Sequence, residues 1–143
     1  MNIKLDNEKL RYLALFEELT GVTPKDCVES GDSGDKLTFV VDGTNMGKAI
    51  GQNGKNIGKV RRKLDKRVDV VEYSDDPEDF LGNIFSSVDV ESIEVKEEDG
   101  EKVAYIGVHD SDKGRAVGKN GWNIERARKL SDRHHGISEV SFK

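Results

Sequence analysis

Two short glycine loops with basic flanks are the parts of this chain best suited to chemistry. Gly51-Gln52-Asn53-Gly54 is followed by Lys55, and Gly118-Lys119-Asn120-Gly121 is followed by Trp122. Glycine lacks a Cβ atom and accepts positive φ, so its backbone can approach a ligand closely. If a helix begins directly after such a loop, its unpaired N–H groups and positive dipole end attract phosphate. The loops therefore predict contact with a sugar-phosphate backbone whose bases stay free to be read, as on a single strand.

The two loops belong to an internal repeat in which Gly118 lies 67 positions after Gly51. Lys/Arg and Ile/Val exchanges fill much of the remaining repeat. Eight residues recur unchanged: Gly47, Ala49, Gly51, Asn53, Gly54, Asn56, Ile57 and Arg61 match Gly114, Ala116, Gly118, Asn120, Gly121, Asn123, Ile124 and Arg128. A repeat of this kind predicts two similar structural units.

The candidate phosphate-binding residues are the loops with their basic and polar flanks. They are Lys48, Gly51, Gln52, Asn53, Gly54, Lys55, Asn56, Lys59 and Arg62 in the first copy, and Arg115, Gly118, Lys119, Asn120, Gly121, Trp122, Asn123 and Arg126 in the second. The first loop has no charge of its own, so Lys55 is expected to compensate. Trp122 matches Lys55, and two interpretations stay open: its ring stacks on a base, worth about 1–3 kcal/mol, or it packs between the two units.

The charge of the chain is distributed unevenly. The formal net charge is −5, which by itself disfavours a nucleic-acid partner. The segment 48–67 holds eight bases and one acid, and the segment 113–133 holds seven bases and two acids. These local charges of +7 and +5 leave −17 for the rest of the chain. Two basic patches on an acidic body indicate that selected surfaces meet polyanions.

Several other classes of protein and site are disfavoured by the sequence. No apolar run approaches the roughly 20 residues that cross a membrane, and Cys27 is alone, so no intrachain disulfide forms. The phosphate loop of nucleotide hydrolases requires Gly-Lys followed by Ser or Thr, whereas Asn56 follows here. Metal binding is disfavoured at two sites. His134 and His135 are adjacent on a predicted helix and point in different directions, and the acids at 75–79 suit the start of a helix. We expect no catalytic residues, no metal and no cofactor, and therefore no enzyme.

The predicted elements repeat in the order α-β-β-α-α-β. The first set is a helix capped by Asp6 and ending near 20, strands at 27–29 and 36–41, helices at 44–50 and 55–66, and a strand at 68–71. The second set is a helix capped by Asp76 with an apolar stripe from Phe80 to Val88, strands at 90–96 and 103–108, helices at 112–117 and 122–133, and a strand at 137–142. We expect two domains, 1–74 and 75–143, that together form an α+β fold.

Both segments, Ile50-Gly-Gln-Asn-Gly-Lys-Asn-Ile57 and Val117-Gly-Lys-Asn-Gly-Trp-Asn-Ile124, resemble the KH-domain signature I-G-x-x-G-x-x-I. The element order is similar to the type II form, which has a three-stranded sheet and a GXXG loop. Two adjacent copies resemble the tandem KH module of the NusA transcription factors, and the short chain resembles their archaeal form. One GXXG loop would be weak support for the KH resemblance. Two such loops in register, in a resemblance that covers nearly the whole chain, are a specific signal.

The resemblance implies a non-enzymatic protein that binds single-stranded RNA and acts in transcription elongation, termination or antitermination. RNA polymerase would be a further partner, no membrane would be involved, and we expect a cytoplasmic monomer. A ribosome-associated or RNA-processing KH protein is the first alternative. An enzyme acting on a phosphorylated small molecule is the second, and it would require a catalytic constellation that the sequence does not contain.

Overall fold

The computed structural model describes residues 7–143, so the predicted cap Asp6 lies outside the described residues. The chain divides into two compact units. Among the described residues, the first takes in residues 7–29 together with Asp35–Tyr73, and the second takes in Ser30–Gly34 together with Ser74–Lys143. The predicted domain bounds, 1–74 and 75–143, stay a prediction. Within residues 7–143 no helix combines the length and the apolar character needed to cross a membrane.

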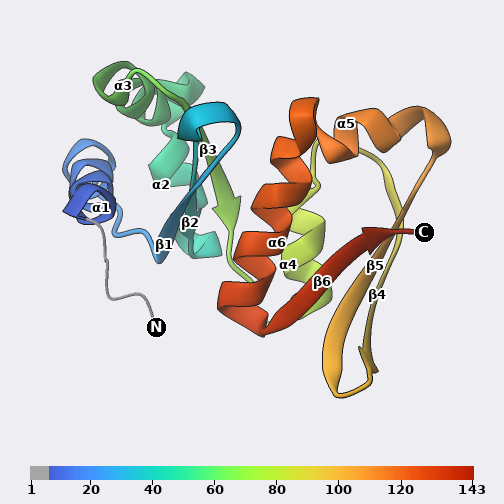
Figure 1. Cartoon of the computed structure of the whole chain (residues 1–143). Coiled ribbons are helices and arrows are strands. Elements are labelled where there is room, and N and C mark those ends of the chain that lie inside the picture. The colour runs from blue at the N-terminus through green and yellow to red at the C-terminus, as the bar shows by residue number, and fades with distance from the viewer. Residues whose placement is uncertain (1–6) are drawn as a thin grey trace. The chain divides into compact units, whose positions relative to one another are not determined.

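The first unit has the predicted element order (Figure 1). Its elements are α1 (Asn7–Thr20), β1 (Asp26–Ser30), β2 (Lys36–Val41), α2 (Met46–Ile50), α3 (Lys55–Leu64) and β3 (Arg67–Glu72). The strands form one sheet in the order β1-β2-β3, and β2 runs parallel to β3. The α-β-β-α-α-β prediction and the three-stranded sheet are thus confirmed.

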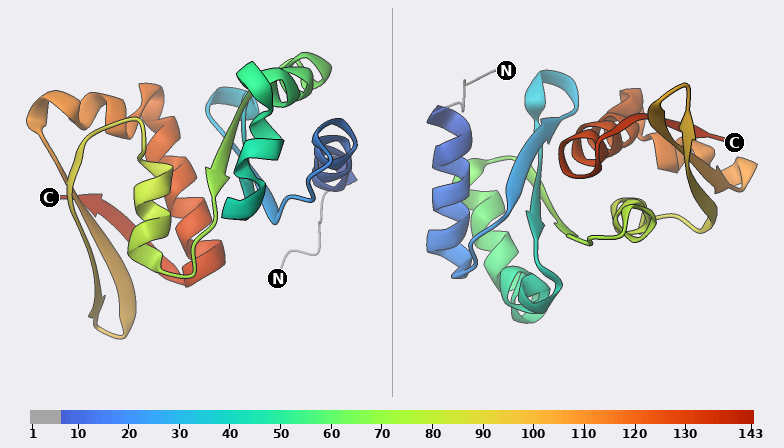
Figure 2. Two further views of the ribbon diagram at one scale, coloured as in Figure 1. Left: turned by 180° about the vertical axis from the view of Figure 1, so that it is seen from behind. Right: turned by 90° about the horizontal axis from the view of Figure 1, so that it is seen from below.

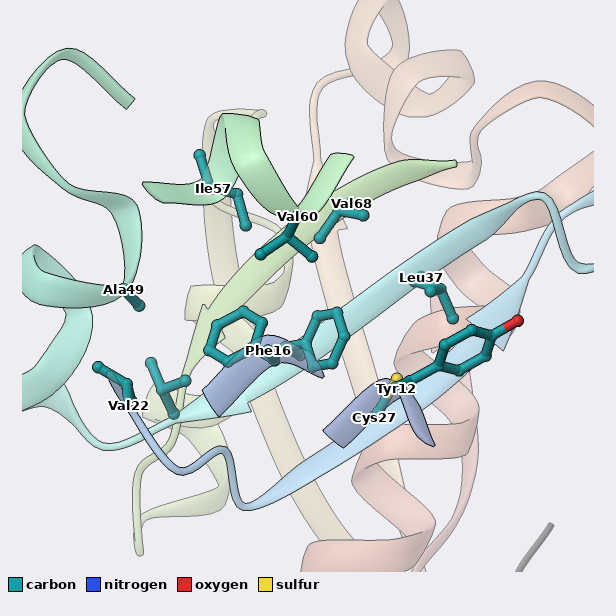
Figure 3. Packing of buried hydrophobic residues seen from close by; sticks show 11 residues of the cluster. Tyr12, Phe16, Val22, Cys27, Leu37, Ala49, Ile57, Val60 and Val68 are labelled. Carbon is teal, nitrogen blue, oxygen red and sulfur yellow. The ribbon is translucent and has the colours of Figure 1, made fainter. Parts of the chain in front are cut away.

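The core of the first unit lies between its helices and its sheet. Figure 2 (right) shows α1 and α3 on the same side of the strands. Tyr12 and Phe16 are one helical turn apart and buried, and the Phe16 ring stacks on Phe39 of β2 with centroids 4.3 Å apart. Ile57 and Val60 of α3 belong to the same cluster (Figure 3). This packing fixes α3, and with it the loop from which α3 begins.

The second unit repeats the architecture. Its elements are α4 (Pro77–Ile84), β4 (Val90–Glu98), β5 (Glu101–Val108), α5 (Lys113–Val117), α6 (Trp122–His135) and β6 (Ile137–Phe142). β4 pairs antiparallel with β5, and β5 pairs parallel with β6. Phe80, Ile84 and Phe85 are buried, and the Phe85 ring meets Phe142 of β6 edge-on at 5.9 Å. The recurrence of the element order confirms the predicted α+β fold of two α-β-β-α-α-β units.

Several predicted boundaries are wrong by a few residues. α3 ends at Leu64 rather than at 66, because Asp65 takes a left-handed conformation with φ 52° that closes the helix. α4 ends at Ile84, although Val88 further along the predicted stripe is still buried. The strands of the β4–β5 hairpin extend to the turn at Asp99 and Gly100, whose positive φ values of 53° and 82° suit a two-residue hairpin turn.

Candidate nucleic-acid interface

The first glycine of each loop has a conformation that other residues avoid. Gly51 has φ 79° and ψ 166°, and Gly118 has φ 82° and ψ 159°. This region is essentially restricted to glycine. A Cβ atom at Gly51 would lie 2.8 Å from the backbone nitrogen of Asn56, and one at Gly118 would lie 2.9 Å from that of Asn123. Both the backbone conformation and the close approach therefore require glycine here.

The remainder of each loop is a left-handed turn that delivers the chain into a helix. Asn53 and Asn120 have φ values of 57° and 56°, a conformation that asparagine tolerates better than most residues. Gly54 and Gly121 follow with φ values of 71° and 77° and stand at the N-caps of α3 and α6. Within residues 7–143 no side-chain hydrogen bond caps either helix. The two loops thus place the same turn before the positive end of a helix.

Asn56 and Asn123 fasten each loop to the short helix that precedes it. The Asn56 side-chain amide donates to the Lys48 carbonyl at 2.7 Å, and that of Asn123 donates to the Ala116 carbonyl at 2.8 Å. Asn123 is 1% exposed. The sequence predicted both asparagines as phosphate contacts, but in the structure their amides hold the loop in shape.

The predicted cations of the first copy form an exposed face on α3. Lys55, Lys59 and Arg62 follow helical spacing, so they lie on one side of the helix. Lys55 and Arg62 are exposed and Lys59 is partly exposed, and within residues 7–143 none of the three is paired with an acid. The Arg62 guanidinium reaches back over Gly58, where a Cβ atom would lie 3.4 Å from Nη1. Lys48 is also exposed, but its side chain lies against Gly21 at the end of α1.

The cations of the second copy are placed differently. Lys119 is exposed within the loop itself. Arg115 is exposed, but it pairs with Asp112 at 2.6 Å. Arg126 is 5% exposed, and its guanidinium donates to the Ile84 carbonyl at 2.9 Å and to the Asn123 side-chain oxygen at 2.7 Å. The predicted role of Arg126 as a basic flank therefore does not fit its burial, because its donors serve the protein interior.

Trp122 has a place that neither predicted interpretation included. A Cβ atom at Gly118 would lie 2.7 Å from the indole Cδ1 and Nε1 atoms, so the ring packs over the loop that precedes it. The Arg126 guanidinium lies 4.9 Å from the ring centroid. Trp122 is partly exposed. The indole therefore packs against the second loop, and the residue stays partly exposed.

Two features of the helices were missed in the sequence. Lys63 is an exposed cation at the end of α3 that no acid pairs within the described chain. Arg61 and Arg128, which recur in the repeat, donate to the carbonyls of Val68 and Val140, so their recurrence reflects a helix-to-strand bond. The run of bases at 61–63 could have identified Lys63 as a candidate contact. The sequence alone could not show that Arg61 in the same run bonds to the protein backbone instead.

Residues 7–143 contain no group of three or more His, Cys, Asp and Glu side chains that could hold a metal ion.

Comparison with protein families gives two matches. Residues 77–141 match the NusA-like second KH domain, and residues 10–100 match the KH domain.

Comparison with individual proteins gives matches over nearly the whole chain. The probable transcription termination protein NusA of Halococcus morrhuae is 36% identical, and the match covers 99% of this chain and 99% of that protein. The protein of the same name from Methanococcus vannielii is 34% identical over 98% of this chain and 79% of its own length. The crystal structure of APE1850 superposes with a TM-score of 0.79 at 40% identity, covering 95% of this chain and 98% of that one.

Proposed function

The chain belongs to the NusA family of transcription termination proteins in its archaeal form, and we propose that it acts by clamping single-stranded RNA with both glycine loops. The family is one of non-enzymatic transcription factors, and its KH domains are nucleic-acid-binding modules. The observation that supports the clamp is that one turn conformation occurs twice, each time at the start of an α-helix.

The clamp binds through the backbone of the RNA. Amides at the starts of α3 and α6 and the nearby cations meet phosphate oxygens. Neither loop itself contains an acid, although beside the second loop Asn120 Nδ2 donates to the Asp32 carboxylate at 3.0 Å. The exposed Lys55 and Arg62 and the partly exposed Lys59 supply charge at the first loop, and Lys119 supplies it at the second. The bases then face the adjoining protein surface, where part of the Trp122 ring is accessible.

The setting of this activity is transcription. The relatives named above are transcription termination proteins, which favours a nascent transcript over ribosomal or processed RNA as the ligand. We propose that the chain acts in the cytoplasm as a monomer and contacts RNA polymerase while it holds the transcript.

The experiment is to place acids in the loops. The double variants Gln52→Asp/Asn53→Asp and Lys119→Asp/Asn120→Asp bring two carboxylates to the phosphates, each costing about 1 kcal/mol in water. Each double variant should weaken binding of a single-stranded RNA by about tenfold or more and leave the circular dichroism spectrum unchanged. The matched variants Gln52→Asn/Asn53→Ser and Lys119→Asn/Asn120→Ser control for the loss of the original side chains without adding a negative charge. Unchanged affinity in both acid variants, with the fold intact, would refute the clamp.

A further inference from the structure

The first unit has a charged cavity that the loop site does not use. The cavity of about 370 Å³ is lined by Arg61, Lys66, Arg67, Val68 and Asp69. It lies where α3 ends and β3 begins, at the end of α3 opposite to the glycine loop. A ten-residue helix is about 15 Å long, so this site is distinct from the loop.

The walls of the cavity favour an anion. Three cations stand against the single carboxylate of Asp69. Arg61 is held in place because its Nε atom donates to the Val68 carbonyl at 3.0 Å. Arg67 is exposed, and within the described chain no acid pairs with its guanidinium.

Lys66 is held beside the cavity by groups of the neighbouring elements. Its ammonium lies 3.7 Å from the carboxylate of the partly exposed Glu29, at the long end of an ion pair. It also lies 5.9 Å from the ring centre of Tyr12. Burial, and to a lesser extent Glu8 and Glu29, raise the pKa of Tyr12. A tyrosine phenol is neutral near pH 7 even at its ordinary pKa of about 10, so Tyr12 adds no second negative charge next to Lys66.

A basic ridge runs from the glycine loop along α3 to the end of that helix, where the cavity lies. Lys55, Lys59 and Arg62 lie on one face of α3, and Lys63 follows at its end. No acid within residues 7–143 pairs with any of them. Basic residues at the end of a helix also complement its dipole, but that effect requires neither a cavity nor a ridge that starts at the loop.

The second unit does not continue its clamp in this way. Arg126 matches Lys59 and is buried, and Lys129, which matches Arg62, pairs with Glu125 at 3.1 Å. Arg128 lies 3.6 Å from Glu139. The ridge is therefore a property of the first copy and not of the fold in general.

From these observations we infer that the cavity at the end of α3 is a second phosphate-binding site, which holds the backbone of an RNA strand that has passed over the first glycine loop. This inference rests on the proposed RNA clamp and extends it. The ridge binds phosphates between loop and cavity, and Lys66 and Arg67 bind the last ones. The footprint of the first unit is then longer than the roughly four nucleotides that one GXXG loop engages.

The test compares a four-nucleotide and a twelve-nucleotide single-stranded RNA on the full chain. In Lys66→Gln/Arg67→Gln the longer RNA should bind about tenfold more weakly at low salt. The slope of log affinity against log salt should become shallower by about 0.7 for each phosphate that the variant no longer neutralises. The four-nucleotide RNA should keep its affinity. The control Lys96→Gln/Lys102→Gln removes the same charge from the β4–β5 hairpin and should have a much smaller effect.

Three results would overturn the inference: an unchanged affinity for the longer RNA, an equal decrease in the control, or an equal decrease for both RNA lengths. Arg67→Gln alone leaves the Lys66–Glu29 pair intact, and it should show about half of the change in the salt slope.

The acid variants of the loops, measured in the same assay, separate the proposed clamp from the proposed second site. If they weaken binding and Lys66→Gln/Arg67→Gln does not, only the second site is wrong. If neither weakens binding, the clamp itself is wrong.

Discussion

At the scale of single residues, recurrence in the repeat has more than one cause. Gly51 and Gly118 recur because the loop backbone excludes a Cβ atom. Gly47 and Gly114 also recur, yet a Cβ atom there would meet no protein atom within 4 Å. Sequence comparison of the two copies cannot separate these cases, because both appear as an unchanged glycine. Only the backbone conformation does so.

This difference predicts opposite effects on stability. Gly51→Ala should lower the free energy of unfolding by about 1–3 kcal/mol, because φ 79° with ψ 166° strains any side chain. Gly47→Ala should leave it unchanged or raise it by up to about 1 kcal/mol, since alanine is the better helix former. Urea denaturation of both variants measures the difference. Equal destabilisation by the two substitutions would contradict the loop geometry.

At the scale of elements, the sequence predicted the order of helices and strands and the start of each helix after a loop. Hydrophobic periodicity and the glycines carry that information locally. Helix ends were less predictable, because the closure of α3 depends on the left-handed conformation of Asp65.

The burial of Arg126 could not be predicted from the sequence. Its position in the repeat is that of the accessible Lys59, and its surroundings come from Ile84 of another helix. Burial of this kind depends on tertiary packing, whereas a local charge count registers only another base. The same limit applies to Asn123 and to Trp122, whose partners lie in the preceding loop and short helix.

Lys59 and Arg126 therefore make a matched pair for experiment. Arg126→Ala should lower the free energy of unfolding by about 2–4 kcal/mol, because it removes buried charge-assisted hydrogen bonds and leaves their acceptors unpaired. Lys59→Ala should change stability by no more than about 0.5 kcal/mol and should weaken RNA binding. Denaturation curves and RNA titrations of the two variants check both expectations. A stable Arg126→Ala variant with reduced RNA affinity would restore Arg126 as a direct RNA contact.

At the scale of the whole molecule, basic and acidic residues are concentrated in different segments of the chain. A protein of net charge −5 repels a polyanion at long range, but its bases are concentrated in two segments that contain the glycine loops. RNA association must therefore run through those segments. The two copies also differ: the first has a basic helix face that no acid within residues 7–143 pairs, and the second has its charge in the loop at Lys119. The repeat thus provides two loops of one backbone conformation with different electrostatic surroundings.

The two-loop clamp is tested most directly by following the backbone amide resonances of the full chain while one twelve-nucleotide single-stranded RNA is added. We predict that resonances of both loops, including those of Gly54 and Gly121, shift and saturate together at one RNA per chain. Saturating RNA that leaves the resonances of both loops unchanged would contradict the clamp.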